Sequence, residues 1–260
     1  MIKYLLIVFL LGMTWQAVAD DNRIRLNQSG NSDIYAITQI GNSNTLGGVT
    51  QTVSELTPTA IANISGGNNQ ITVRQGDSQT HIGNNQIDLA VSGSGNILNL
   101  NQGMDQNGYS NGLDQGGHHQ IDYVNGMGNT ITVIQQNEAL NAGMFSSLQV
   151  IGNLNTVGIT QTGVAMHQLI ASVTGDQTTL ISNQSGTSPH TINVTSSGNG
   201  NSAQITQNNN GSVGSNTASI TLNNYGAPAS VNLTQTGGQN YSITQSCATT
   251  CGVVTVKQGM

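Results

Sequence analysis

The side chains of this sequence that could do covalent chemistry are two cysteines, Cys247 and Cys251, which stand four residues apart near the end of the chain. A Cys-x-x-x-Cys spacing is typical neither of zinc sites nor of thioredoxin-like redox sites, and no histidine lies near it in sequence. If the chain is exported, its two cysteines indicate one disulfide. We therefore expect these two to be paired, either closing the last turn of the chain or lying in a loose C-terminal turn.

Histidines and acidic residues could supply acid–base catalysis or bind a metal ion. The histidines have no repeating acidic partner, and no Gly-x-Ser-x-Gly motif or metal-ligand pair occurs. His118 and His119, beside Asp114, could bind a metal ion weakly, but we expect them to be an exposed loop pair. We expect the other three, His81, His167 and His190, in loops or at strand edges. The sequence therefore predicts no enzyme, no catalytic residue, no metal site and no cofactor.

Amide side chains recur more regularly than any ionisable group. A glutamine closes each of ten similar segments, at intervals of 23 to 33 residues. Repeats of about this length are the signature of a solenoid. Stacked amides can hydrogen bond to the copies above and below, which satisfies groups that cost about 1 to 3 kcal/mol each when buried unpaired. The predicted ladder is Gln28, Gln51, Gln75, Gln102, Gln135, Gln161, Gln184, Gln207, Gln235 and Gln258.

A glycine-rich arc precedes the closing glutamine. In the unit that ends at Gln207, we expect Gly198 and Gly200 to supply the positive-φ residues of a tight turn. The closing glutamine always lies 11 residues after the residue two before the first glycine, so extra residues fall after the glutamine. The predicted arc residues are Gly66, Asn69, Gly93, Asn96, Gly126, Asn129, Gly152, Asn155, Gly175, Gly198, Asn201 and Gly226.

Alternating residues on both sides of this arc predict two short strands per unit. Ala203 and Ile205 fall on one side of a strand, and Gln204 falls on the other. A lone two-stranded hairpin is marginal in water, so the units must stack. We expect an all-β fold, a β-solenoid of strand-arc-strand repeats with two facing, cross-β-like sheets and about ten rungs.

The first 19 residues predict an export signal, with Lys3, an apolar run over 5–11 and the small-x-small site Ala17-Val18-Ala19 before Asp20. This run is too short to cross a bilayer and no other long apolar stretch occurs, so we expect no membrane span in the mature chain. Residues 20–260 then form one repeat domain, with insertions at about 54–60, 103–119 and 136–148.

The composition excludes some partners. Charged residues make up 6% of the chain, against roughly 25% in an average soluble domain. Without residues 1–19, four basic side chains remain against eleven acidic ones, so no basic cluster exists for nucleic-acid phosphates. Gly, Asn, Gln, Ser and Thr dominate as in low-complexity tracts, but the alternating Ile, Val and Leu favour order.

The repeat resembles that of curlins, the subunits of secreted amyloid fibres in bacterial biofilm matrix. Gly198, Gly200, Asn201, Ala203 and Gln207 match the pattern Gln-x-Gly-x-Gly-Asn-x-Ala-x-x-x-Gln after its first glutamine. The units that close at Gln102 and Gln135 match except for a larger apolar residue at the alanine position, and Gln28, Gly30 and Gln39 match near the N-terminus. At the family's first glutamine this chain has mostly valine, and its units outnumber the five typical of curlins.

The resemblance implies a secreted, cell-surface fibre subunit whose partner is another copy of itself, with a related nucleator subunit and a dedicated outer-membrane exporter. The terminal strands carry few charges that could cap them, which favours end-to-end stacking. Two alternatives remain: a minor nucleator of such a fibre, and a monomeric solenoid that binds ice, a glycan or a host matrix. The latter would use an outward threonine column, composed of Thr38, Thr50, Thr160, Thr206, Thr234 and Thr244.

Overall fold

Every regular element of this computed structural model is a β-strand, and no helix occurs in the residues that it describes. Within the same residues no helical segment has the length and hydrophobicity needed to cross a membrane. The structure describes residues 22–24, 26–41, 43–47, 62–76, 83–103, 116–137, 143–209, 214–224, 226–247, 249 and 251–259.

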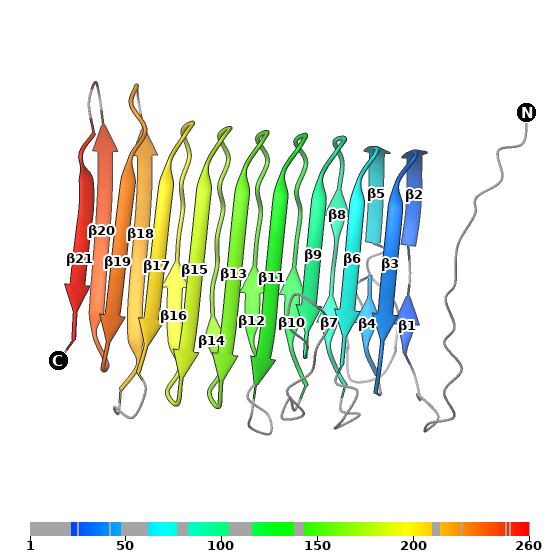
Figure 1. Cartoon of the computed structure of the whole chain (residues 1–260), viewed down its shortest axis with the longest axis horizontal. Coiled ribbons are helices and arrows are strands. Elements are labelled where there is room, and N and C mark those ends of the chain that lie inside the picture. The colour runs from blue at the N-terminus through cyan, green and yellow to red at the C-terminus, as the bar shows by residue number, and fades with distance from the viewer. Residues whose placement is uncertain are drawn as a thin grey trace, which may run out of the picture.

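One wall of the molecule is a nine-stranded sheet whose strands contain the closing glutamines, here named the glutamine sheet (Figure 1). All its strand pairs are parallel, and equivalent residues of successive repeats lie in register. Its strands are β3 (Ile34–Gln39), β6 (Gln70–Gln75), β9 (Ile97–Gln102), β11 (Thr130–Asn137), β13 (Thr156–Gly163), β15 (Thr179–Gly186), β17 (Ser202–Asn208), β19 (Ser230–Thr236) and β21 (Val253–Gln258).

The opposite wall, here named the second sheet, also has nine strands. They are β1 (Arg23–Ile24), β4 (Thr45–Leu46), β7 (Gln86–Ile87), β10 (His119–Ile121), β12 (Phe145–Ser147), β14 (His167–Gln168), β16 (His190–Asn193), β18 (Asn216–Asn224) and β20 (Asn240–Cys247). A three-stranded parallel sheet, β2 (Leu26–Asn31), β5 (Ala62–Gly67) and β8 (Ala90–Val91), continues this wall in the first three repeats.

The chain passes from one wall to the other and back, and strands of the two walls run in opposite directions (Figure 1). The prediction of an all-β solenoid with stacked parallel sheets is therefore confirmed. The predicted count of ten rungs is wrong, because the solenoid has fewer turns and each long sheet holds nine strands.

The core lies between the two walls because inward and outward residues alternate along each strand. In β17 the inward residues Ala203, Ile205 and Gln207 are buried, and the outward Gln204 is exposed. The same alternation in every repeat forms one hydrophobic core that runs along the solenoid.

The predicted insertions agree with the strands only in part. Residues 54–60 lie outside the described part of the chain. The predicted insertion 103–119 is too long, because His119 begins β10. The predicted insertion 136–148 is also too long, because β11 extends to Asn137 and β12 begins at Phe145. These residues pair with neighbouring strands because their side chains continue the inward and outward alternation.

Candidate functional site: stacked amide columns and open ends

A column of glutamines runs inside the glutamine sheet. Each Nε2 donates to the Oε1 of the glutamine in the next strand, over 2.8 to 3.3 Å. All the amides donate in the same direction, toward the C-terminal end, so the ladder is polar. Its members are Gln39, Gln75, Gln102, Gln135, Gln161, Gln184, Gln207, Gln235 and Gln258.

Amides of this column also donate a second hydrogen bond to the backbone of the opposite wall. Gln161 Nε2 also donates to the backbone oxygen of Phe145 at 2.8 Å, and Gln184 Nε2 donates to that of Gln168 at 2.9 Å. Both glutamines are fully buried. Amides such as these therefore satisfy groups in neighbouring repeats and in both sheets.

The structure places eight of the ten predicted ladder glutamines in this column, from Gln75 to Gln258. Gln28 instead lies in β2, where it is aligned with Ile64 and its Nε2 donates to Asp33 Oδ2 at 2.9 Å. Gln51 lies outside the described residues. Gln39, which counting by period missed, is the first member; it stands 11 residues after Gln28, and that spacing could have found it.

A second polar column lies in the arcs. The backbone N–H of Asn129 donates to Asn96 Oδ1 at 3.0 Å, and that of Asn155 donates to Asn129 Oδ1 at 2.9 Å. Thr178 takes an asparagine position, and its N–H still donates to Asn155 Oδ1 at 2.8 Å. The column comprises Asp33, Asn69, Asn96, Asn129, Asn155, Thr178 and Asn201. The arcs are thus bonded to one another as the strands are.

The glycines three residues before these positions lie where successive arcs touch. A Cβ on Gly126 would overlap the carbonyl oxygen of Gly152, and a Cβ on Gly152 would overlap that of Gly175. The same close approach occurs at Gly30, Gly66, Gly93 and Gly175. These glycines are therefore required by the stacking distance between backbones.

The predicted reason for these glycines, a positive φ, holds at Gly200 but is wrong at Gly198, where the preceding Ser197 has a φ of 109°. The last two arcs also differ from the prediction, because strand register aligns Ser196 with Leu222 and makes these arcs two residues longer. The Asn224 side chain, not a glycine, lies against Gly198, and Gly226 is exposed.

A third column lies in the opposite turn and includes histidines. Asn44 Oδ1 accepts a hydrogen bond from the backbone N–H of Asn85 at 3.3 Å, and His118 Nδ1 accepts one from that of Met144 at 3.1 Å. Imidazole Nδ1 thus replaces the amide oxygen as acceptor. The expectation that His118 is exposed is wrong, because it is fully buried in this column, and His119 belongs to β10. Asp114 and His81 lie outside the described residues.

His167 and His190 continue this column. Their Nε2 atoms lie 2.9 Å from the backbone oxygens of Thr162 and Ser185, respectively. His190 Nδ1 accepts from the N–H of Asn216 at 3.2 Å, so its proton is on Nε2 and the ring is neutral. Burial lowers the pKa of His167 to about 4, with a contribution from His190, and burial also lowers the pKa of His190.

An acid and an amide are paired inside the core at β10. Gln120 Nε2 donates to Asp122 Oδ1 at 2.6 Å, and both side chains are buried. Burial raises the pKa of Asp122 to about 7, and Asp88 contributes in the same direction, although the bond from Gln120 opposes it. No three potential metal ligands of the His, Cys, Asp or Glu type converge within the described part of the chain.

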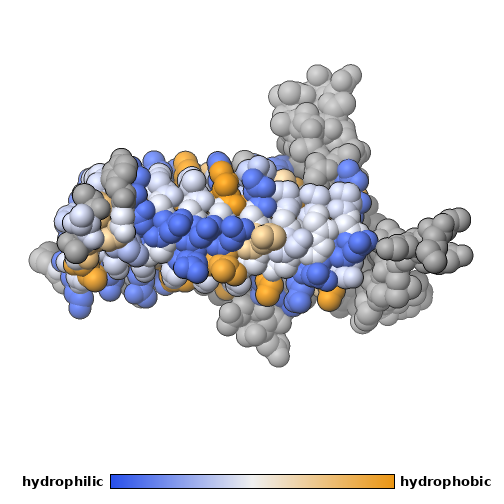
Figure 2. All heavy atoms as spheres, turned by 90° about the horizontal axis from the view of Figure 1, so that it is seen from above, coloured by the Kyte–Doolittle hydropathy of each residue, from blue (hydrophilic) through white to orange (hydrophobic). Residues whose placement is uncertain are grey.

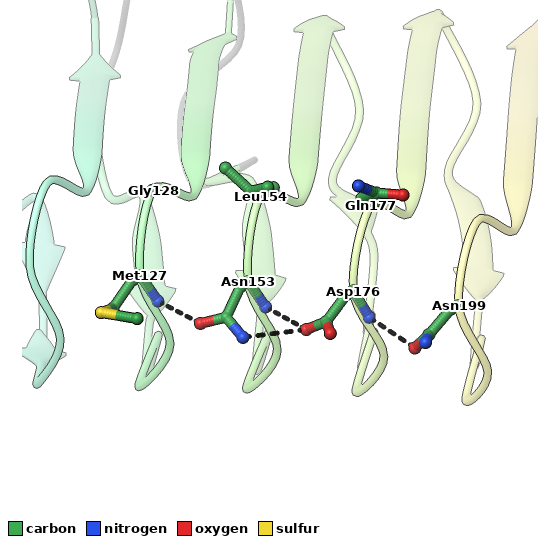
Figure 3. Close-up of a pocket in the computed structure, with 7 residues that line it drawn as sticks. All are labelled: Met127, Gly128, Asn153, Leu154, Asp176, Gln177 and Asn199. Carbon is green, nitrogen blue, oxygen red and sulfur yellow. Dashed lines mark hydrogen bonds between the residues drawn. The ribbon is translucent and has the colours of Figure 1, made fainter.

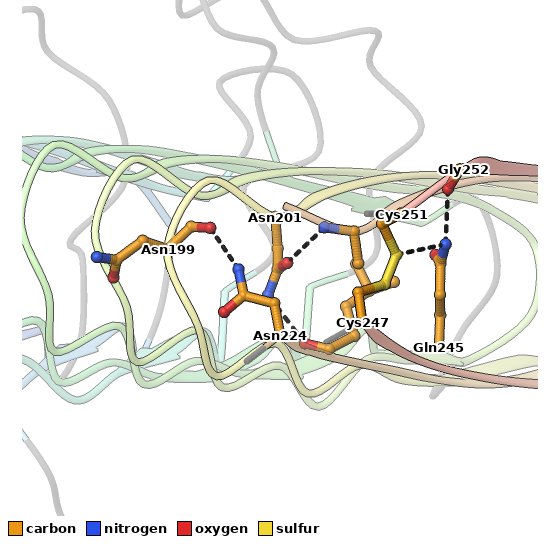
Figure 4. The surroundings of a disulfide bond; sticks show 9 residues. Asn199, Asn201, Asn224, Gln245, Cys247, Cys251 and Gly252 are labelled. Atoms are coloured by element: carbon orange, nitrogen blue, oxygen red, sulfur yellow. Dashed lines mark hydrogen bonds between the residues drawn. A yellow bond between two sulfur atoms is a disulfide. The ribbon is translucent and has the colours of Figure 1, made fainter. Parts of the chain in front are cut away.

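The disulfide lies in the last arc (Figure 4). Cys247 and Cys251 are bonded, as predicted, with their Cα atoms 5.4 Å apart. Gln245 Nε2 donates to Cys251 Sγ at 3.0 Å and to the Gly252 backbone oxygen at 2.6 Å. Cys247 is buried against the core, so the bond joins the end of β20 to the start of β21.

Within the described residues, the core is partly exposed at both ends of the solenoid. Ile24 is 43% exposed, whereas Leu46, its aligned neighbour in the next repeat, is 1% exposed. The hydrophobic residues that pack against the core yet are only partly buried all belong to the first and last repeats: Leu26, Tyr35, Ile37, Tyr241, Cys251, Val254 and Val256.

A shallow hollow on the arcs is lined by Met127 and Leu154 among others, and hydrogen bonds within the protein run along it: the Asp176 N–H donates to Asn199 Oδ1 at 2.9 Å (Figure 3). Seen from above, hydrophobic residues are scattered among hydrophilic ones (Figure 2).

The predicted threonine column is interrupted. Thr38, Thr160, Thr206 and Thr234 do share one outward position in register. Arg74, Asn101, Ile134, Asn183 and Lys257 occupy this position in the other repeats. Thr244 lies in β20 of the second sheet, and Thr50 is outside the described residues.

Comparison of the chain with protein-family models, with characterised proteins and with solved structures finds no match.

Proposed function

We propose that the protein is the structural subunit of a secreted, curli-like functional-amyloid fibre of bacteria, in which chains stack end to end and form biofilm matrix or adhesive filaments. The observation that carries this proposal is the open core at both ends. Among the described residues, the edge strands β3 and β21 each have one neighbour in the glutamine sheet, and an unpaired edge presents N–H and C=O groups to another chain.

The last strand of the glutamine sheet has the inward residues of an interior strand. The inward residues of β21 are Val254, Val256 and Gln258, and none of them is charged. A solenoid that stays monomeric usually carries a polar outer face on its terminal repeats. The exposed Lys257 points to the outer surface of the sheet, so it does not cover the core.

The other parts of the proposal follow from the curlin resemblance: export by a dedicated outer-membrane channel, a related nucleator subunit and a location at the cell surface. The disulfide is compatible with an extracellular location. No role as an enzyme is proposed, and no cofactor or nucleic-acid partner.

Assembly of purified protein tests the proposal. We expect sedimenting, unbranched filaments in electron micrographs. Val256→Lys, which puts a charge on the open core of β21, should keep the protein folded but monomeric. Thr255→Lys is the matched control, because it adds the same charge on the outward side of the same strand.

The alternative of a monomeric binding module predicts a different result. Protein that remains monomeric for days, with equal behaviour of both lysine variants, would contradict the fibre and favour this alternative. Thermal hysteresis would then test ice binding, which the interrupted threonine column does not favour.

A further inference from the structure

One inward column carries glutamine at its two ends and no glutamine between them. Gln28 in β2 is aligned with Ile64, and Ile64 is aligned with Val91. At the other end Leu222 is aligned with Gln245. The positions between Val91 and Leu222 hold Val124, Val150, Val173 and Ser196.

Gln245 is incompletely satisfied within the chain. Its Nε2 donates to Cys251 Sγ and to the Gly252 backbone oxygen, but its Oε1 is buried without a hydrogen-bond partner. The neighbour in the column, Leu222, has no donor to offer. A buried polar atom without a partner is costly, and when the Gln245 amide turns toward the open end, a glutamine stacked on it supplies a donor.

The two edge strands of the glutamine sheet also each begin with an exposed hydrophobic residue on the outer face. Val253, the first residue of β21, and Ile34, the first residue of β3, are 69% and 61% exposed, the highest values among the large hydrophobic residues that the structure describes. The register of the glutamine sheet gives them the same position in the repeat, at opposite ends of the solenoid.

We infer that the last repeat of one chain docks on the first repeat of a second copy in the register of the internal repeats, with Gln245 over Gln28 of the second copy and Val253 over its Ile34. This inference rests on the proposed function. It also fixes polarity: Gln258, the last residue of the donor series, has an Nε2 that faces Gln39 Oε1 of the second copy.

The glutamine pair can be tested by a double-mutant cycle. Gln28→Leu and Gln245→Leu should each raise the critical concentration for assembly about tenfold, since each leaves one amide of the junction buried without its partner. The double variant should assemble at nearly the wild-type concentration, because leucine over leucine repeats the apolar interior of the column. Thermal unfolding of the monomers checks that all variants fold.

The outward pair gives an independent test. Val253→Glu and Ile34→Lys should each slow assembly, and the double variant should recover, because opposite charges then face each other across the junction. Ile97→Lys is the control, since Ile97 occupies the same outward position inside the solenoid and is 43% exposed.

The outcomes separate the two proposals. If the wild-type protein never assembles, the proposed function fails. If it assembles but the double variants show only the product of the single effects, the fibre stands and this register is wrong.

Discussion

The imidazole rings of His167 and His190 stack in adjacent repeats, with their centroids 4.7 Å apart and their planes within 11°. Both rings occupy positions that asparagine fills elsewhere in the column, where Oδ1 accepts a backbone N–H. Only a ring with an unprotonated Nδ1 can do this, so the fold requires neutral histidine at His190.

Burial of His167 beside this ring predicts a dependence of stability on pH. The pKa of His167 is about 4 in the folded protein, below its usual 6.5. The unfolded chain therefore takes up the proton first, and the contribution of His167 is complete above pH 6.5 and lost as pH falls toward 4. The loss should be about 3 kcal/mol in the free energy of unfolding of the monomer. In denaturant titrations across this range the wild type should lose stability relative to His167→Asn, which has no titrating group at this position; parallel curves would contradict the assignment.

Asp122 should act in the opposite direction. Its folded pKa of about 7 lies above the usual 3.8, so the folded protein holds a proton that the unfolded chain releases. Stability from the neutral acid is present below pH 3.8 and is lost as pH rises through 7, by up to about 4 kcal/mol. Asp122→Asn, which stays neutral, should be more stable than the wild type at pH 8 and lack this slope. Equal stability at pH 8 would show that Asp122 is ionised without cost.

Removal of one ladder glutamine should break bonds in both directions. In Gln184→Leu, Gln161 loses its acceptor and Gln207 loses its donor, both in the core. We expect a loss of about 2 to 5 kcal/mol in the free energy of unfolding, measured by urea titration. Gln204→Leu, on the outer face of the next strand, is the control and should change stability by less than about 0.5 kcal/mol. Similar effects of the two changes would refute the ladder.

The glycine column should not tolerate a methyl group. Gly152→Ala places a Cβ against the Gly175 carbonyl oxygen, so two arcs must separate, and we expect a loss of at least about 2 kcal/mol in the same titration. Gly252→Ala is the matched control, because nothing lies within 4 Å of a Cβ there. An unchanged midpoint for Gly152→Ala would mean that the arcs are not in contact.

Much of this architecture follows from the sequence because side-chain alternation and amide spacing are local signals. Gln75 through Gln258 could be found by their period, and the disulfide by the isolation of its two cysteines. The prediction for Gln28 is wrong because a count from glutamine to glutamine does not tell the ladder of the glutamine sheet from the inward column of β2, β5 and β8. Either column can hold a glutamine. Its register is set by the pairing of β2 with β5, a contact between distant segments.

Other features depend on equivalences that the sequence does not display. The sequence predicts His118 in a loop because a column that mixes histidine with asparagine shows no recurring residue type. In the structure, however, His Nδ1 and Asn Oδ1 accept the same kind of hydrogen bond. The glycines from Gly66 to Gly198 lie at the predicted positions in the arcs, but the predicted reason is wrong for Gly198, and Gly226 is not part of the glycine column. The distance between stacked backbones, which excludes a Cβ at Gly126 and Gly152, appears only when the repeats are placed on one another.

Cryo-electron microscopy of assembled protein tests the central claim most directly. We predict filaments in which strands lie across the axis at a spacing of about 4.8 Å that continues unbroken from β21 of one chain to β3 of the next. Filaments whose subunits meet through the outer faces of their sheets, or a preparation that contains only single solenoids, would contradict it.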